Sequence, residues 1–309
     1  MTNDLLVLPC YAFDMDELVK KIIEQEFSTT PFLIEEIKGK GKNNHVFKVV
    51  VNNVPIILRL RNLEQTLELY IKEKWCAEAV KNAGIPTPEI FKLGTVDGYA
   101  FSLQEFIEGT QGADAPSELE KIWLTLGQYA SLINKIPASN LRLDYEKFIS
   151  GLFEGEYFVV RNVFSKELSE KIESRLKETY VWRFSPTLCH GNLSPNNVII
   201  DPTGVIYIID WGTATGNRTP ESELAEIYTW NTGKENIARF IEEYGLKKDE
   251  VKSMMRDIQT LILLRLVHVI VRKMPKDNNW SQDAYIKEMA AKLSEISDYR
   301  QDVLFAKNL

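Results

Sequence analysis

The segment from Leu188 to Trp211 restricts the fold of this chain more than any other. It contains two apolar runs, Val198–Ile200 and Val205–Ile209, separated by Asp-Pro-Thr-Gly. Asp, Pro and Gly favour tight turns, so the two runs predict the strands of a β-hairpin. Polar residues stand before the first run and directly after the second. Because a hairpin brings its open ends together, we expect these polar groups to be neighbours in space.

The polar groups at the open end of this hairpin suit a hard divalent cation. Asn197 directly precedes the first strand and Asp210 follows the second, while His190 and Asn192 belong to the same polar cluster upstream. Amide and carboxylate oxygens are ligands that Mg²⁺ accepts. The sequence therefore predicts Asn197 and Asp210 as a pair of magnesium ligands.

Composition, charge and cysteine usage limit the classes of protein to which this chain can belong. The chain has 309 residues, of which 44% are hydrophobic and 26% charged, which is an ordinary globular composition with room for two lobes. The net charge of −7 argues against nucleic acid as the main partner and is compatible with a cationic small substrate. Cys10, Cys76 and Cys189 form neither a disulfide framework nor a metal-binding spacing, which favours the cytoplasm.

No part of the sequence indicates a membrane. The N-terminus lacks the basic and apolar regions of a signal peptide. The most apolar stretch, Thr260–Val271, is too short to span a bilayer and contains Arg265, so we expect a buried core helix. The sequence leaves the oligomeric state open.

The first hundred residues predict a helix followed by a mainly β region, and the remainder predicts helices. Strands are predicted at Phe32–Ile37, His45–Val51, Val54–Arg61, Glu89–Gly94 and Tyr99–Phe106, with a helix over about 63–82 between the third and fourth. Beyond Gly109 the sequence predicts mainly helices. One begins at a capping box at Ser117, and another begins at a Thr219 cap with Pro220 at the first helical position. The others are predicted over Ser165 to about Tyr180 and near 235–244, 249–273 and 284–297. We place the boundary between two lobes, 1–106 and 107–309, at this change.

The residue order of the central segment resembles that of the catalytic segment of the aminoglycoside phosphotransferase family. This family has a protein-kinase-like fold and choline-kinase-type relatives. The similarity lies in His-Gly-Asn-Leu-Ser-Pro-Asn-Asn, a hairpin and then Ile-Asp-Trp. It implies a bilobal α+β protein with a β-rich N-terminal nucleotide-binding lobe and a mainly helical C-terminal catalytic and acceptor-binding lobe. It also implies ATP or GTP with Mg²⁺ in the cleft, and transfer of phosphate to a hydroxyl of a small, cationic, aminoglycoside-like molecule.

The resemblance assigns the nucleotide to several upstream residues. Gly39, Gly41 and Asn44 stand between two predicted strands where the family has a phosphate-binding loop. The residues after the fifth strand, including Glu105 and Ile107, stand at the linker whose backbone bonds adenine. Taken without the resemblance, the first segment would be a flexible hairpin turn and the second an edge strand leaving a sheet.

A basic residue and a helix glutamate follow the same family pattern. Arg59 stands where protein kinases have the Lys that binds the α- and β-phosphates. An Arg guanidinium can bind a phosphate group through two parallel hydrogen bonds. Glu73 is the helix partner that the spacing favours, with Glu68 and Glu78 as rivals. For a helix this charged, a solvated face accounts for most of its glutamates.

The catalytic roles that the resemblance carries over fall on four residues. His190 orders the loop, and Asn197 and Asp210 hold Mg²⁺. Asn192 stands where the family has the Asp that receives and orients the acceptor hydroxyl. A neutral amide cannot act as a base, so Asn192 predicts nucleotide binding with slow transfer.

Three explanations of Asn192 stay open on the sequence: a low-activity or non-catalytic member, a member whose base lies elsewhere, or a deliberate substitution. A nucleotide-binding pseudokinase that acts as a sensor or interaction module is the main alternative to an enzyme. A protein kinase is disfavoured because we find no Ala-Pro-Glu-type activation segment before Glu223.

Acidic residues of the helical lobe are candidates for binding a cationic acceptor. They are Glu154, Glu156 and the Glu221–Glu226 group, each of which is more simply interpreted as a surface glutamate. Glu223 stands where the family has Asp, and we interpret it as structural or as support for the site.

Overall fold

The computed structural model describes residues 14–37, 45–62, 66–154, 164–230 and 233–273, together with 284, 287, 288, 291 and 292. Its contacts divide the chain into two compact units, one of Met1–Glu78 with Thr87–Glu108 and one of Ala79–Pro86 with Gly109–Leu309. The lobe boundary predicted at 106/107 compares with 108/109 in this division, which also assigns 79–86 to the second unit.

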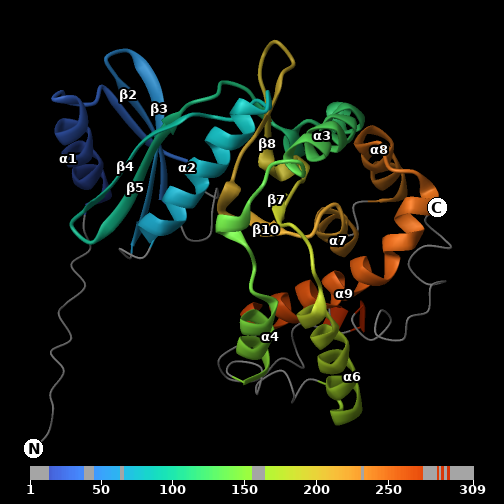
Figure 1. The fold of residues 1–309 in the computed structure, drawn as a ribbon. Helices are drawn as coiled ribbons and strands as arrows, with labels where there is room; N and C mark the ends of the chain where they lie inside the picture. The colour runs from blue at the N-terminus through green and yellow to red at the C-terminus, as the bar shows by residue number, and fades with distance from the viewer. Residues whose placement is uncertain are drawn as a thin grey trace, which may run out of the picture. The chain divides into compact units, whose positions relative to one another are not determined.

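The first unit is built on a five-stranded antiparallel sheet in the order β1-β2-β3-β5-β4 (Figure 1). The strands are β1 (Leu33–Glu36), β2 (His45–Val51), β3 (Val54–Asn62), β4 (Ile90–Val96) and β5 (Tyr99–Glu105). Both hairpin turns use residues with positive φ, Asn52 and Asn53 after β2 and Asp97 and Gly98 after β4. Asn, Asp and Gly tolerate this conformation best, which is why these two turns could be located from the sequence.

Two helices accompany this sheet. Helix α1 (Met15–Phe27) buries Leu18, Val19, Ile22 and Ile23 in one cluster with sheet residues such as Phe47, Leu58 and Phe101. Helix α2 (Thr66–Asn82) connects β3 to β4, and the three residues before it, where we predicted the helix to begin, lie outside the described residues. The β-rich N-terminal region that the sequence predicts is confirmed.

The second unit is mainly helical (Figure 1). Its helices are α3 (Leu119–Ile133), α4 (Tyr145–Glu154), α6 (Lys166–Lys177), α7 (Glu221–Thr229), α8 (Lys234–Tyr244) and α9 (Lys248–Lys273). Helix α9 is buried along most of its middle and packs against α4, α6 and α7, which confirms the predicted core helix. Of the predicted helix at 284–297, only a few residues are described.

Helices α3 and α8 approach each other closely at Gly127. A Cβ at this position would lie 2.3 Å from the carbonyl oxygen of Phe240. Real Cβ atoms do not come so close to a backbone oxygen, so only glycine permits this spacing between the helices.

Two small sheets hold the segments that carry the candidate site. Strand β7 (Thr187–Cys189) pairs with β10 (Thr215–Asn217), and β6 (Thr110–Gln111), β8 (Val198–Ile200) and β9 (Ile206–Ile208) form a three-stranded sheet. The predicted hairpin is therefore present. At its turn, one oxygen of Asp201 accepts hydrogen bonds from the N–H groups of Thr203 and Val205 and from the Thr203 hydroxyl, at 2.9, 2.8 and 2.7 Å.

Two predicted helix starts are wrong in detail. The Ser117 capping box is absent, because α3 is preceded by a 3₁₀ turn over Pro116–Glu118 and begins after Glu118 without a side-chain cap. Thr219 does not cap α7 either, because Pro220 occupies the cap position and the Thr219 hydroxyl lies 2.6 Å from that of Thr187. A local 3₁₀ turn replaces the predicted cap of α3, and a contact with Thr187 replaces that of α7.

No helix among the described residues is long and apolar enough to cross a membrane.

Candidate functional site

The open end of the hairpin brings Asn197 and Asp210 together. Val198 of β8 is the register partner of Ile208 of β9, and the N–H of Ile209 donates to the carbonyl of Asn197 at 3.0 Å. Asn197 and Asp210 therefore leave the ladder at the same end, as the sequence predicted. Their side chains come from backbone that the hairpin holds in register.

The side chain of Asn197 braces the loop that precedes it. It is buried, with 8% of its surface exposed, and its Nδ2 donates to the carbonyl of Asn192 at 2.8 Å. This bond uses the donor end of the amide and leaves Oδ1 as its acceptor atom. The amide thus both fixes the loop and offers an oxygen of the kind that Mg²⁺ binds.

Asp210 adopts a left-handed backbone conformation, with φ 64° and ψ 69°. Its side chain is exposed and caps the following 3₁₀ turn, with Oδ1 accepting from the N–H of Gly212 at 3.4 Å. An aspartate in this region costs backbone energy, and such residues gather where the surrounding structure holds a functional group in place.

His190 is a buried, neutral support of the loop. Its ring is fully covered, its Nε2 lies 3.2 Å from the carbonyl of Ile209, and it packs on Trp211 with ring centroids 4.5 Å apart. Burial lowers the pKa of His190 to about 4, against the opposing effect of the Asp210 charge. A histidine that is neutral and enclosed orders the backbone between the two hairpin ends, which agrees with the structural role expected from the sequence.

Glu223 supports the same loop by accepting hydrogen bonds from its backbone. Its carboxylate is completely buried and accepts from the backbone N–H of His190 at 2.5 Å and also from that of Gly191. From the other side, the Thr213 hydroxyl donates to the carbonyl of His190 at 3.0 Å. Burial raises the pKa of Glu223 to about 6, although hydrogen bonds from the loop oppose this shift.

Gly191 and Asn192 follow in the clamped segment. Gly191 has a φ of 74°, and a Cβ there would lie 2.9 Å from the carbonyl oxygen of Thr213. Asn192 is half-buried and its carbonyl is held by Asn197. The residue at the position expected for a catalytic base thus stands on backbone that is fixed on both sides, but its side chain is a neutral amide.

The first unit contains the predicted ion pair. Arg59 of β3 and Glu73 of α2 meet through Nη1–Oε2 and Nη2–Oε1 contacts of 2.5 and 3.4 Å, and only 11% and 2% of the two side chains is exposed. Of the two rivals, Glu78 pairs with Lys74 at 2.8 Å and Glu68 is exposed. The pairing of Arg59 with Glu73 is confirmed, while its role toward a nucleotide stays a prediction.

The remaining nucleotide residues are only partly placed. Gly39, Gly41 and Asn44 lie outside the described residues. Glu105 ends β5, and its carboxylate accepts from the N–H of Glu89 at 3.1 Å, so this side chain has a local partner. Ile107 is half-buried in the segment after β5.

The interpretation of the Glu221–Glu226 group as surface glutamates is wrong. Glu221 is buried and pairs with Arg218 at 2.8 Å, and Glu226 pairs with Arg265 at 3.0 Å. Burial raises the pKa of Glu226 to about 7, against the opposing charge of Arg265. Helix α7 is enclosed on nearly all sides, which its short and mixed sequence did not indicate. Of the other candidates, Glu156 and the side chain of Glu154 lie outside the described residues.

The sequence profile of the phosphotransferase enzyme family matches residues 34–251, which include both the Arg59–Glu73 pair and the hairpin. The chain belongs to this family. It is therefore grouped with small-molecule kinases that act on hydroxyl groups. The aminoglycoside 3'-phosphotransferase of Streptomyces fradiae is 25% identical over 181 residues, which cover 52% of this chain and 67% of that relative.

Solved structures of similar fold confirm the kinase-like α+β architecture. The GDP and kanamycin complex of APH(2")-IIia has a TM-score of 0.67 at 17% identity, covering 92% of this chain and 99% of that chain. The aminoglycoside phosphotransferase APH(4)-Ia has a TM-score of 0.69 at 16% identity, covering 90% and 98%. The AMP-bound spectinomycin phosphotransferase APH(9)-Ia has a TM-score of 0.63 at 16% identity, covering 92% and 98%.

Proposed function

We propose that this protein transfers the γ-phosphate of ATP or GTP, with Mg²⁺, to a hydroxyl of a small cationic molecule of the aminoglycoside type. The observation that carries the proposal is the pairing of Asn197 and Asp210 at the open end of one hairpin, in a chain of the phosphotransferase family. The nucleotides and aminoglycosides in the solved structures of similar fold support the choice of substrates.

The metal ligands proposed are Oδ1 of Asn197 and the carboxylate of Asp210. Within the described ranges, no group of three His, Cys, Asp or Glu residues gathers to enclose a metal ion. Two oxygen ligands fit Mg²⁺, which usually completes its shell with water and substrate phosphates. When bound, Mg²⁺ would neutralise charge on the phosphate oxygens during transfer.

The phosphates are assigned to residues of the first unit. Arg59 is held by Glu73, and its guanidinium is the group that the family pattern assigns to the phosphate oxygens. Gly39, Gly41 and Asn44 are proposed as the phosphate loop, and the backbone near Glu105 and Ile107 is proposed to bond the base. These assignments rest on the family pattern of the sequence.

Asn192 is proposed to orient the acceptor hydroxyl without taking its proton. General-base catalysis contributes about 10²- to 10⁴-fold to a rate, and the neutral amide of Asn192 cannot supply this contribution. Phosphoryl transfer depends mainly on positioning and charge neutralisation, for which the other residues suffice. We therefore expect slow but measurable transfer.

A second candidate function follows from the same residue. A family member that binds nucleotide but lacks the carboxylate at position 192 can serve as a nucleotide-dependent sensor or interaction module. The neutral amide of Asn192, on a loop that is otherwise fully braced, is the observation that favours it.

Substitution of Asn192 by Asp decides between the two functions. Phosphate transfer from ATP and GTP would be measured for the parent and for Asn192→Asp against kanamycin, hygromycin B, spectinomycin, choline and simple sugars. The enzyme proposal expects a gain of about 10²- to 10⁴-fold for one acceptor. Asn196→Asp is the matched control, because it adds the same charge to an exposed neighbour in the same loop.

Three results would count against the enzyme. No transfer by the parent or by Asn192→Asp, with nucleotide binding retained, favours the sensor. An equal gain in Asn196→Asp shows that charge near the loop, and not position 192, sets the rate. Failure of Mg·ATP and Mg·GTP at millimolar concentration to raise the melting temperature contradicts both functions. A cytoplasmic location and the exclusion of nucleic acid as the main partner stay predictions.

A further inference from the structure

Residues 109–114 lie against the segment that carries the proposed metal ligand Asn197. They include β6 and a 3₁₀ turn over Gly112–Asp114. Strand β6 pairs with β8, and the 3₁₀ turn contacts the turn over Pro195–Asn197. No residue of the 109–114 segment has a part in the phosphate transfer as proposed above.

Two glycines allow this segment to approach its neighbours closely. A Cβ at Gly109 would lie 2.2 Å from the carbonyl oxygen of Ile200. A Cβ at Gly112 would lie 2.8 Å from the carbonyl oxygen of Pro195. Real Cβ atoms do not come so close to a backbone oxygen, so only glycine permits this approach on either side of the strand. The backbone of Gln111, between the two glycines, is therefore held directly against β8 and the turn before it.

The side chain of Gln111 reaches beyond the ladder of β6 and β8. In this ladder Gln111 is the register partner of Ile199, where the pairing ends, and its Nε2 donates to the carbonyl of Asn196. This carbonyl belongs to the peptide that joins Asn196 to Asn197. The bond thus fixes the direction from which the side chain of Asn197 leaves the backbone, at a peptide that the ladder does not reach.

Bonds within the hairpin and its loop hold the other polar groups of Asn197. Its N–H donates to the carbonyl of Ser194 at 2.9 Å, and its carbonyl accepts from the N–H of Ile209 at 3.0 Å. Its Nδ2 donates to the carbonyl of Asn192 at 2.8 Å. Gln111 adds a contact from outside the hairpin, at the carbonyl that directly precedes Asn197.

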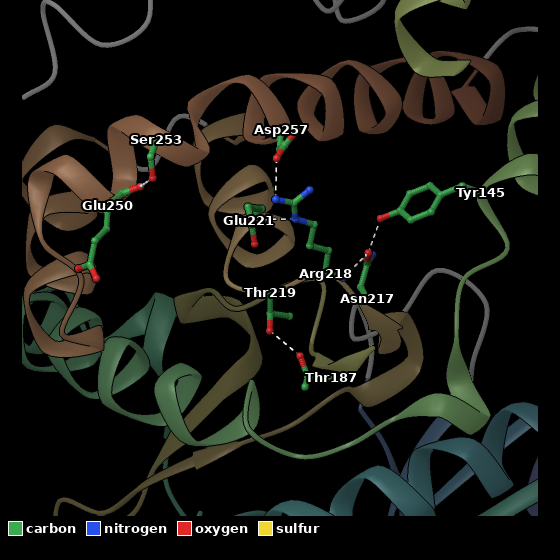
Figure 2. A network of polar contacts seen from close by, with 9 residues as sticks. All are labelled: Tyr145, Thr187, Asn217, Arg218, Thr219, Glu221, Glu250, Ser253 and Asp257. Atoms are coloured by element: carbon green, nitrogen blue, oxygen red, sulfur yellow. Dashed lines mark hydrogen bonds and ion pairs between the residues drawn. The ribbon is translucent and has the colours of Figure 1, made fainter. Parts of the chain in front are cut away.

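The backbone that follows the second proposed ligand, Asp210, is held by different residues (Figure 2). Asn217, at the end of β10, accepts from the Tyr145 hydroxyl and from the N–H of Arg218. The Arg218 side chain pairs with Asp257 of α9 at 2.7 Å. A change on the side of β6 should therefore displace one proposed ligand without displacing the other.

Displacement of one ligand matters more for Mg²⁺ than for Ca²⁺. Mg²⁺ requires nearly ideal octahedral geometry at about 2.0–2.1 Å, whereas Ca²⁺ accepts flexible geometry at about 2.3–2.6 Å. Groups that orient metal ligands through hydrogen bonds typically change metal affinity by about 10- to 100-fold when they are removed. For a bond to the peptide next to a ligand we expect an effect at the lower end of this range.

We propose that Gln111 is a positioning residue for Asn197, which fixes the peptide before this ligand and thereby favours Mg²⁺ over Ca²⁺. The observation that carries the proposal is the bond from Nε2 of Gln111 to the Asn196 carbonyl, made from backbone that two glycines hold against the loop. The inference rests on the proposed function, because it concerns the metal ligands of that site.

The test compares Mg²⁺ and Ca²⁺ in the stabilisation of the full chain by nucleotide. Mg·ATP and Ca·ATP, or their GTP counterparts, are titrated with the metal in excess, and apparent dissociation constants follow from the rise in melting temperature. Gln111→Met keeps the length of the side chain and removes its donor. We expect the constant for the Mg²⁺ complex to rise about 10-fold and that for the Ca²⁺ complex to rise less than about 3-fold.

Gln111→Glu separates positioning from charge. The new carboxylate has nearly the shape of the amide but cannot donate to the Asn196 carbonyl. Its charge acts equally on both divalent complexes, so a purely electrostatic effect leaves the ratio of the two constants unchanged. Positioning predicts that the ratio of the Mg²⁺ constant to the Ca²⁺ constant rises, as in Gln111→Met. Gln128→Met is the matched control, because it makes the same substitution at an exposed residue of α3 and should change neither constant.

A measurement without metal or nucleotide follows the peptide itself. The N–H of Asn197 donates to Ser194 in the turn that Gln111 supports. Its hydrogen exchange should be roughly 3- to 10-fold faster in Gln111→Met, because the turn opens locally more often, and unchanged in Gln128→Met.

Three results would overturn the role of Gln111 while the parent still responds to the Mg²⁺ complex. They are unchanged constants in Gln111→Met, an equal rise for the Mg²⁺ and Ca²⁺ complexes, and unchanged hydrogen exchange at Asn197. In each case the proposed function stands. A parent whose melting temperature responds to neither Mg·ATP nor Mg·GTP overturns the proposed function and this inference together, so the two failures are distinguishable.

Discussion

The ion pair of the first unit and the braced loop of the second unit are built in opposite ways. Arg59 and Glu73 stand on a regular strand and a regular helix, and they neutralise each other directly. The loop around His190 has irregular backbone, and Glu223 and Asn197 bind its peptide groups rather than an opposite charge. The comparison shows two means of fixing polar groups. One pairs opposite charges, and the other hydrogen-bonds the peptide groups of the backbone to side chains.

The two arrangements leave different atoms for chemistry. In the ion pair, both charged groups are almost completely enclosed. At the hairpin, the supporting groups are buried, whereas the carboxylate of Asp210 is exposed. Removing one member should therefore cost fold stability in the first case and ligand binding in the second.

The largest effect on stability is expected for Glu73→Ala. It leaves the guanidinium of Arg59 enclosed without a counter-charge, which should lower the free energy of unfolding by about 3–5 kcal/mol. Chemical denaturation would measure the loss. The double substitution Arg59→Met with Glu73→Leu should recover most of it, and Glu78→Ala, at an exposed ion pair, should cost less than about 1 kcal/mol. A double variant as unstable as Glu73→Ala would contradict the account of an uncompensated charge.

The next effect separates ligand binding from stability at Asp210. Asp210→Ala should lower the ligand-free melting temperature modestly, because alanine loses the cap at Gly212 and suits the positive φ less well, but it should remove the stabilisation by Mg·ATP. At 100 times the dissociation constant this stabilisation is about 2.7 kcal/mol. Thermal unfolding with and without nucleotide measures it, with EDTA as one control and Asp249→Ala, whose side chain is 96% exposed, as the other. Full retention of the nucleotide effect in Asp210→Ala would contradict the assignment of this carboxylate to the metal.

The smallest effect concerns the pH dependence that Glu223 imposes. The pKa of Glu223 is raised from 4.5 to about 6 in the folded chain, so its ionisation opposes folding and stability is lost as the pH rises between these values. Glu223→Gln still accepts a hydrogen bond and does not titrate. Relative to the parent, its free energy of unfolding should therefore rise by about 2 kcal/mol from about pH 4 to pH 7. A difference that stays constant over this range would show that Glu223 does not titrate as stated.

Sequence patterns were informative where a local rule determines the structure. The strands around Asn52-Asn53 and Asp97-Gly98 and the hairpin at Asp201 follow from turn residues between apolar runs. The choice of Glu73 followed from its spacing to the end of α2. These features depend on neighbours in the sequence, or on one strand and the helix that follows it.

The features that the sequence did not reveal depend on distant partners. For Glu223 the family pattern indicated a structural or supporting role, but not its partner, which is the backbone of His190, 33 residues earlier in the chain. Tyr145 and Trp182 come together through Asn217 and Arg218, and no local pattern relates these residues. The unused cap at Thr219 has the same origin, because its hydroxyl lies 2.6 Å from that of Thr187, whereas the cap at Ser117 is replaced by a local 3₁₀ turn.

The turn at Asp201 also has a consequence for the order of folding. One carboxylate oxygen gathers three donors from the next four residues, so the hairpin can close through local contacts alone. Hairpins form in about 1–10 μs, well before distant segments meet in a chain of this size. We expect pulsed hydrogen exchange during refolding to protect the amides of Asp201 and Ile209, which donate to Val205 and Asn197 within the hairpin, earlier than those of α9, and simultaneous protection would contradict this order. Asn197 and Asp210 would then be neighbours from the first moments of folding, long before the helices that enclose their loop have assembled.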